Sequence, residues 1–211
     1  MDVAELLAPL PALTDAGPHE LVGGTADGLR FADLELAGDA TGSTVLECLL
    51  EGCALDGLQL ARTRFSTVGL LRCRATELLA GDTTWLDSVV EGGRFGAVTA
   101  HGAAWTRVTL TGVRADYVNL RGAKLVEVAL VDCVLGELDL GGADLRRVSV
   151  SGGELGTLHV SGATCREVDL TGAGLPALDG LTGLRGATIS PAQLAGWSRG
   201  MAADLGIRVA P

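Results

Sequence analysis

The chain is poor in aromatic residues: Phe, Tyr and Trp make up 3% of its 211 residues, although apolar residues reach 47%. A buried core must therefore be built from Leu, Val and Ala, which argues against an ordinary mixed β-sandwich. No stretch approaches the roughly 20 uninterrupted apolar residues of a transmembrane helix. The first residues carry no basic segment typical of a signal peptide, so we expect no membrane association and a cytoplasmic location.

Motifs of common active sites are also missing. The sequence has no Cys-x-x-Cys pair, which argues against a zinc site. It has no strand-to-helix GxGxxG or Walker motif, which argues against a nucleotide site. Because function must be argued from a site and none is visible, we predict a protein that is not an enzyme and that has no catalytic residues, metal or cofactor.

Basic residues are outnumbered, and the net charge of −10 is unevenly distributed. Residues 1–40 carry eight acids and one base, a sum of −7. Residues 41–175 carry 16 acids and 12 bases, a sum of −4, and residues 176–211 carry two acids and three bases, a sum of +1. Because nucleic acids attract positive charge, we expect no direct nucleic-acid binding.

Glycine is abundant, at 31 of 211 residues, about twice its usual share of roughly 7%. A second regularity is an apolar residue at every fifth position: from Val45 to Leu175, all 27 residues taken in steps of five are apolar. The residues two positions before each of them are uncharged, and all 28 charges of this span fall on the other three positions. This period of five differs from the 3.6 of an α-helix.

The repeat has a simple physical interpretation. Two inward residues separated by one outward residue form a minimal β-strand, and the next two positions must turn the chain. Gly supplies the positive φ that a type II turn needs. Gly stands at the second turn position in ten repeats: Gly52, Gly57, Gly92, Gly102, Gly112, Gly122, Gly142, Gly152, Gly162 and Gly172. Alternating strands and corners predict a closed coil.

The large residues indicate four repeats per coil. Phe65, Trp85 and Trp105 are spaced by 20, so we expect them to stack in one interior column with Leu125. Small inward residues beside them are consistent with a packed interior. The 135 residues of the repeat region then make about 6.75 coils, a rod roughly 30 Å long at about 4.8 Å per coil.

At this point the sequence resembles the pentapeptide repeat family, whose repeat is written A(D/N)LXX. Clear matches are residues 143–147 (ADLRR), 118–122 (VNLRG) and 168–172 (VDLTG). The resemblance covers about two-thirds of the chain and implies a mainly β fold, a right-handed quadrilateral parallel β-helix with a C-terminal α-helix. We expect three segments: an N-terminal cap over 1–25, the β-helix over 26–180, and a C-terminal helix and tail over 181–211.

Cysteine usage fits a packed interior. All five cysteines fall on inward positions, where we predict small core fillers rather than disulfides or metal ligands. They are Cys48, Cys53, Cys73, Cys133 and Cys165. Unpaired cysteines are typical of a reducing compartment, which agrees with a cytoplasmic location. The high Gly, Ala and Leu content indicates a GC-rich bacterial source.

The register slips near the front of the chain. We assign Leu29 and Leu34 to a first coil over residues 26–40, joined to the next by one extra residue around 38–42. The segment before it contains three of the six prolines. There Asp2 is expected to start a short helix over residues 3–7 that ends before Pro9.

The C-terminal end predicts a helix. Ser190 is a suitable N-cap, Pro191 fits the first helical position, and Gln193 completes a capping box. The helix is expected over 191–205, with Gly206 as its stop. Its apolar stripe consists of Leu194, Trp197, Met201 and Leu205. This stripe either covers the end of the rod or packs against a second copy, and we favour a homodimer, which the family resemblance also implies.

Outward columns are the remaining candidates for binding. Arg74, Arg94 and Arg114 share one column, where like charges repel. Either neighbours such as Glu77 and Asp116 offset them or an anionic partner does. A second column, from Asp87 on, alternates in sign and predicts ion pairs between coils. A third face predicts exposed apolar residues: Leu49, Leu71, Val89, Ala129 and Val131.

Two functions follow from these features. The first is a non-catalytic scaffold or protein-binding module whose protein partner the sequence does not name. The alternative is implied by the family, some members of which bind DNA gyrase and related topoisomerases as DNA-like dimeric rods and protect them from quinolones. That mimicry needs an acidic surface along the rod, whereas the repeat region carries only −4 and an arginine column. We therefore favour the scaffold.

Overall fold

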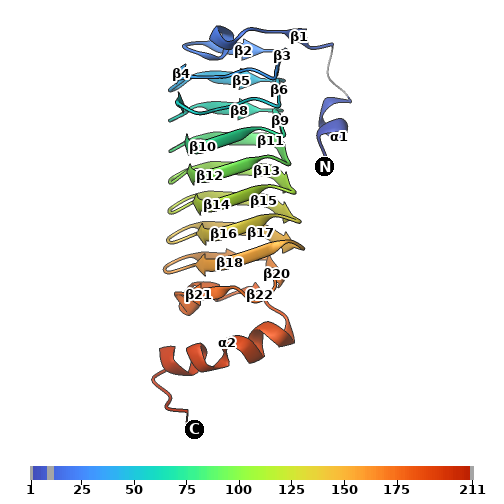
Figure 1. The fold of residues 1–211 in the computed structure, drawn as a ribbon. Coiled ribbons are helices and arrows are strands. Elements are labelled where there is room, and N and C mark those ends of the chain that lie inside the picture. Colours follow the sequence, from blue (N-terminus) through green and yellow to red (C-terminus); the bar gives the residue numbers. More distant parts are fainter. Residues whose placement is uncertain (1, 9–11, 210–211) are drawn as a thin grey trace.

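The computed structural model describes residues 2–8 and 12–209 as a rod of stacked coils (Figure 1). The rod is a parallel β-solenoid of about eight turns, followed by one C-terminal α-helix. The predicted fold class is thereby confirmed. Because the chain advances along the rod, each coil lies directly on the preceding one, and residues one coil apart are neighbours in space.

Two sheets form the walls of the rod. The first has fourteen strands: β1 (Thr14–Asp15), β2 (Thr25–Asp27), β3 (Leu29–Ala32), β5 (Thr44–Leu46), β6 (Leu49–Glu51), β8 (Arg64–Ser66), β9 (Gly69–Leu71), β11 (Thr84–Glu91), β13 (Ala104–Thr111), β15 (Lys124–Val131), β17 (Asp144–Ser151), β19 (Thr164–Arg166), β20 (Val168–Gly172) and β22 (Ala187–Thr188). The second has eight: β4 (Gly38–Asp39), β7 (Leu58–Gln59), β10 (Arg74–Leu79), β12 (Arg94–Thr99), β14 (Arg114–Asn119), β16 (Val134–Asp139), β18 (Glu154–His159) and β21 (Ala177–Asp179).

The pairing register confirms four pentapeptides per coil. Trp85 of β11 pairs with Trp105 of β13, which pairs with Leu125 of β15. In the second sheet, Phe95 of β12 pairs with Ala115 of β14. Each of these offsets is 20 residues and each pairing is parallel. Residues of one sequence column therefore form one ladder along the rod.

The predicted aromatic column lies inside the rod. The rings of Phe65 and Trp85 stack with their centroids 4.0 Å apart. Trp85 and Trp105 meet edge to face, with centroids 6.4 Å apart. The small inward side chains of Thr63 and Thr83 are fully buried beside them. Small and large residues thus share the interior as the spacing predicted.

Most of the fifth-position residues are buried in one continuous core. Val90, Val150 and Leu155 are partly exposed, and Leu175, in the last coil, is 58% exposed. All five cysteines are buried and free, as predicted. The core is therefore a single column of apolar side chains that runs the length of the rod.

Nine of the ten predicted corner glycines have positive φ, for example Gly52 at 65° and Gly162 at 72°. The prediction for Gly172 is wrong. Gly172 belongs to β20, whose pairing with β17 shifts register between Ser149 and Ser151. The chain bulges there and does not pass through the left-handed region.

One corner of the rod turns without glycine in seven successive coils, from Glu47 to Glu167. Its residues adopt φ between 48° and 58°, a conformation that ordinary L-residues adopt at a cost. The seven residues are Glu47, Thr67, Asp87, Arg107, Glu127, Arg147 and Glu167. These residues form the column that was predicted to carry ion pairs between coils, and their side chains lie on the outer surface of the rod.

The first coil differs from the prediction. We expected Leu29 and Leu34 at the fifth positions and one extra residue around 38–42. The coil is instead one residue short. Its residues up to β3 pair with residues 19 positions later in the next coil, whereas its residues from β4 on pair with residues 20 positions later. The registers are Ala26↔Val45, Phe31↔Leu50 and Gly38↔Leu58. Both inward positions of these repeats hold apolar residues, so the pattern alone could not separate Leu29 from Phe31.

The N-terminal helix α1 (Val3–Leu7) begins at the predicted residue, since the Asp2 carboxylate accepts the Glu5 N–H at 2.8 Å. Pro9, at which we expected it to end, lies outside the described residues. Figure 1 shows α1 beside the rod rather than on its end. The first coil is closed by β1 and by the 3₁₀-helix η1 (Pro18–Leu21), which buries Leu21 in the core.

The position of α1 corrects one prediction. Leu49 and Val89, expected to be exposed, are 6% and 0% exposed because Leu6 of α1 packs on them. Ala129 and Val131, farther along the rod, remain partly exposed. The apolar face near the N-terminus is thus covered by the chain itself.

The C-terminal coil continues past residue 180, where we expected the solenoid to end. Strand β22 pairs with β20, and the 3₁₀-helix η2 (Leu181–Leu184) places Leu184 in the core. Helix α2 (Pro191–Asp204) follows at once. Its Ser190 cap and Gln193 capping box form as predicted, and Gly206 has φ of 72° just beyond its end.

Candidate interaction surfaces

Arg74, Arg94 and Arg114 lie in one stack on the outer face of the second sheet. Arg74 pairs with Arg94 between β10 and β12, and Arg94 pairs with Arg114 between β12 and β14. All three side chains are exposed because they alternate with inward residues along their strands. Ala54 precedes the stack and Val134 follows it. We call these three residues the arginine stack.

The arginine stack has little internal compensation. Arg74 donates from Nη1 to the carbonyl oxygen of Gly52 at 3.3 Å. Arg94 and Arg114 form no ion pair with any residue in the part of the chain that the structure describes, and neither Glu77 nor Asp116 pairs with them. Neighbouring strands are about 4.8 Å apart, so the three positive charges remain close together.

A shallow hollow of about 440 Å³ lies beside Arg74 and Arg94. Gly96 lies in its floor, where a Cβ would come within 2.4 Å of the Thr76 carbonyl oxygen. Asp56 and Asp116 also line the hollow, and Asp56 accepts the Thr76 N–H at 2.7 Å. Basic and acidic side chains thus both line the hollow.

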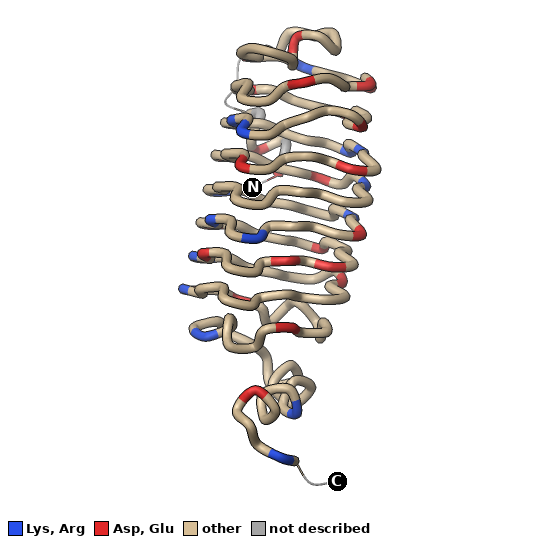
Figure 2. The backbone as a smooth tube through the Cα atoms, turned by 90° about the vertical axis from the view of Figure 1, so that its left-hand side faces the viewer, with Lys and Arg blue, Asp and Glu red and all other residues tan. Residues whose placement is uncertain are grey.

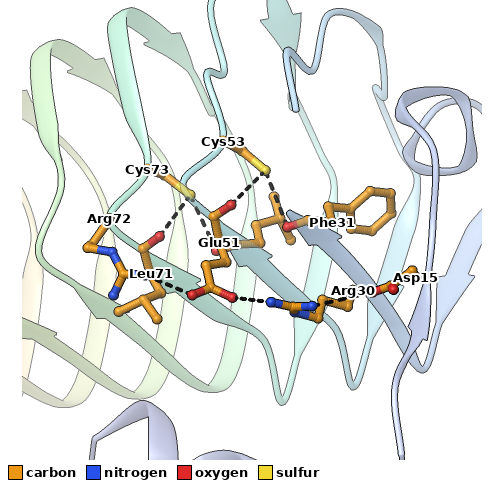
Figure 3. A network of polar contacts seen from close by, with 9 residues as sticks. Asp15, Arg30, Phe31, Glu51, Cys53, Leu71, Arg72 and Cys73 are labelled. Carbon is orange, nitrogen blue, oxygen red and sulfur yellow. Dashed lines mark hydrogen bonds and ion pairs between the residues drawn. The ribbon is translucent and has the colours of Figure 1, made fainter. Parts of the chain in front are cut away.

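Several other arginines of the rod form ion pairs with carboxylates, as Figure 3 shows for Arg30 and Arg72 at Glu51. Its two carboxylate oxygens accept from Arg30 and Arg72, each at 2.7 Å. Arg30 also contacts Asp15 at 3.5 Å, so the network joins the N-terminal strand to three successive coils. The hydrogen bond from Arg30 lowers the pKa of Glu51, and the bond from Arg72 adds to the effect.

The corner column carries the predicted ion pairs. Arg107 donates from Nη2 to Asp87 at 2.8 Å, and Arg147 donates to Glu127 at 2.7 Å. The bond from Arg107 holds the pKa of Asp87 below its ordinary value. Figure 2 shows acidic and basic residues interspersed along the rod. Basic residues therefore interrupt the acidic ones along the described part of the rod.

Helix α2 is held against the last coil by two polar side chains. Gln193 is 1% exposed and donates from Nε2 to the carbonyl oxygens of Leu170 and Gly174, both at 2.7 Å. Trp197 is 7% exposed and donates from Nε1 to the carbonyl oxygen of Pro176 at 2.9 Å. These bonds satisfy backbone groups that an open coil end would leave without partners.

This docking divides the predicted apolar stripe. Trp197 and Met201 face the rod, whereas Leu194 and Leu205 are 53% and 75% exposed. Leu194 and Leu205 therefore do not share the rod-facing side with Trp197 and Met201, because Gln193 rather than Leu194 contacts the last coil. The capping-box signal identified Gln193, but nothing in the sequence indicated that its amide would reach the preceding coil.

The outward side of α2 contributes to an apolar surface. Five of the six large apolar residues exposed among the described ones lie at this end of the rod. They are Leu175, Leu194, Leu205, Ile207 and Val209, which we call the C-terminal apolar surface. A groove of about 350 Å³ lies between α2 and the last coil, where Gly196 leaves room for Leu175. Exposed large apolar residues at one end of a chain are candidates for an interaction site.

The described residues offer little chemistry beyond these surfaces. They contain no group of three or more His, Cys, Asp or Glu side chains that could hold a metal ion. Burial raises the pKa of the Cys48, Cys133 and Cys165 thiols, which keeps them protonated core residues. In the part of the chain that is described, no helix has the length and apolar character needed to span a bilayer.

Comparisons with known proteins agree with the repeat pattern. Residues 116–152 match the pentapeptide repeats, in eight copies. No curated protein matches the chain. Among solved structures, HetL, a pentapeptide repeat protein involved in heterocyst differentiation regulation in the cyanobacterium Nostoc sp. strain PCC 7120, is 18% identical, with a TM-score of 0.47 over 85% of this chain and 92% of HetL.

A second similar structure is QnrB1, a plasmid-mediated fluoroquinolone resistance protein. It is 14% identical, with a TM-score of 0.44 over 92% of this chain and 95% of QnrB1. The period of five, the parallel solenoid and the matched repeats lead to one assignment. The resemblance stated from the sequence is confirmed: residues 116–152 of this chain are pentapeptide repeats.

Proposed function

We propose that the protein is a non-catalytic scaffold that binds an acidic segment of a partner protein along the arginine stack. One observation supports this proposal: Arg94 and Arg114 stand in register without a carboxylate partner among the described residues, whereas Arg72, Arg107 and Arg147 on the same rod are paired. An acidic segment would relieve the repulsion between the stacked charges, and the rigid sheet fixes the spacing of the donors beforehand.

Fluorescence anisotropy of a labelled decaglutamate peptide tests this function. The wild-type protein is expected to bind it with an affinity that falls as salt rises, and a decalysine peptide is expected not to bind at that site. The double variant Arg94→Gln/Arg114→Gln should lose most of the binding. Arg146→Gln/Arg147→Gln removes the same charge from paired positions and should keep it. Equal loss in both variants would mean that only the net charge matters, which contradicts the proposal.

A second copy of the chain is the proposed partner for the C-terminal apolar surface. The exposed fractions of Leu194, Leu205 and Ile207, all above one half, support an interface at this end of the rod. Because α2 already covers the last coil through Trp197, the residues on its other side remain for association. A two-fold arrangement would bring the same surface of both copies together.

Sedimentation equilibrium tests the homodimer with a variant that spares the fold. Leu194→Asp changes an exposed residue and should convert a dimer into a soluble, folded monomer. Ala195→Asp, at an exposed position of the same helix, is the matched control and should remain dimeric. A wild-type chain that stays monomeric at high concentration would limit α2 to covering its own rod.

The topoisomerase function remains the alternative candidate, and charge argues against it. A DNA-like rod needs negative charge along its length, but residues 41–175 sum to −4 and include the arginine stack. A gyrase supercoiling assay with purified protein, with and without a quinolone, distinguishes the two functions. Protection of gyrase that survives Arg94→Gln/Arg114→Gln would favour the alternative.

A further inference from the structure

The interior of the rod contains a cavity of about 70 Å³ beside the aromatic column. Trp85, Trp105 and Phe95 form part of its wall, and Ala80 and Ala100 form another part. Every residue that lines it is apolar. Folded interiors are usually packed with few voids larger than a water molecule, so a void of this size needs a cause.

The cause lies in one column of the repeat. The inward residues before and after the two alanines in this column are Leu60 and Leu120, and all four are buried. Ala80 and Ala100 therefore leave room where the neighbouring coils place larger side chains. The coils cannot close this space, because their backbones are fixed by hydrogen bonds from Ala80 N–H to Thr99 at 2.7 Å and from Ala100 N–H to Asn119 at 2.8 Å.

Water is a poor occupant of this cavity. A buried water molecule needs two to four polar partners, and an apolar cavity with fewer stays dry. The indole N–H of Trp85 is already bonded to Thr83 Oγ1 at 3.2 Å. Trp105 Nε1 has no hydrogen-bond partner among the described residues, which leaves one donor among the side chains of the wall. One donor cannot hold a water molecule against the loss of its bonds in bulk solvent.

We propose that this cavity is a binding site for one small apolar molecule of the size of xenon or dioxygen. An engineered apolar cavity of about 150 Å³ in another protein takes up benzene or xenon. The present cavity has about half that volume, so it accommodates xenon and excludes benzene. The aromatic and aliphatic wall supplies the dispersion contacts that such a guest gains on leaving water.

Xenon is the probe for this site. Methyl-resolved NMR spectra of the full chain under rising xenon pressure should show saturable shifts confined to residues of the cavity wall, such as Val98, Val118 and Leu120. Benzene should cause no saturable shift in the same methyl groups. Thermal unfolding under xenon should move to higher temperature, because a ligand that binds only the folded state stabilises it.

A matched pair of variants links the signal to the cavity. Ala100→Leu fills it with the side chain that Leu120 carries in the next coil and should abolish the saturable shifts. Ala97→Leu adds the same atoms on the outer side of the preceding strand β12 and should leave the saturable shifts unchanged. Ala80→Val adds fewer atoms to the cavity and takes the place of Ala100→Leu if that variant does not fold. Saturable xenon shifts that persist in a folded filled variant, or their absence in the wild type, would overturn the proposal.

Discussion

Thr83 Oγ1 accepts the indole N–H of Trp85 at 3.2 Å, while the hydroxyl itself donates to the Ala80 carbonyl oxygen at 2.9 Å. One coil further along, Ala103 occupies the place of Thr83, and the Trp105 indole N–H has no partner in the described part of the chain. Two successive tryptophans of one column therefore differ by one hydrogen bond. The difference follows from a single hydroxyl two residues before each ring.

The first prediction restores that bond. Ala103→Ser should place an acceptor beside the Trp105 N–H and raise the free energy of unfolding by about 1 kcal/mol, measured by urea denaturation. Ala123→Ser adds the same hydroxyl one coil later, where Leu125 offers no N–H, and should not stabilise the protein. A gain that is equal in both variants would show that the indole is not involved.

The second prediction concerns the aromatic column itself. Trp105→Ala should lower the free energy of unfolding by about 3–5 kcal/mol, because it removes a buried ring and leaves a cavity between Trp85 and Leu125. Thr106→Ala, on the outward side of the same strand, should change it by less than about 0.5 kcal/mol. Urea denaturation followed by far-UV circular dichroism measures both. Unchanged stability of Trp105→Ala would contradict the interior position of the ring.

The third prediction separates two reasons for a glycine. Gly112 and Gly153 both have positive φ, at 64° and 71°. A Cβ at Gly112 would meet no atom within 4 Å, so Gly112→Ala should cost about 1 kcal/mol from backbone strain alone. A Cβ at Gly153 would lie 1.9 Å from the Cys133 carbonyl oxygen. Gly153→Ala should therefore cost clearly more in the same denaturation experiment, and equal losses would refute this distinction.

The fourth prediction is a pH dependence that depends on Glu51. Hydrogen bonds from Arg30 and Arg72 lower its pKa in the folded state below the ordinary value of 4.5. A lowered carboxylate pKa stabilises the fold above the unfolded-state pKa, and this stabilisation is lost as the pH falls through the folded-state pKa. Between pH 6 and pH 3, the free energy of unfolding should fall less in Glu51→Gln than in the wild type.

Glu154→Gln is the matched control for that experiment, because Glu154 is exposed and takes part in no ion pair within the described ranges. Its pH profile should follow that of the wild type. The prediction fails if Glu51→Gln and the wild type lose the same free energy over this range.

The sequence predicted those features that each repeat specifies locally. The positions of Phe65, Trp85 and Trp105 follow from a spacing of 20, and the cap of α2 follows from Ser190 and Gln193. Contacts between distant segments were not predictable in this way. Leu6 covers Val89, which lies far from it in the sequence, and no local pattern predicts this contact. Likewise, the Gln193 amide donates to the carbonyl oxygen of Leu170, 23 residues earlier.

Thr67 provides the last prediction, because a β-branched residue at φ of 56° is unfavourable. Glycine enters this region freely, so Thr67→Gly relieves a strain of about 1–2 kcal/mol. The added flexibility of the unfolded chain offsets about 0.5–1 kcal/mol of this gain. We therefore expect a net stabilisation of up to about 1 kcal/mol. Ser66→Gly, at the preceding residue of strand β8, has no positive φ to relieve and should destabilise the protein. Thermal and urea denaturation of both variants decide the point: a loss of stability in Thr67→Gly as large as that in Ser66→Gly would show that this corner stores no strain.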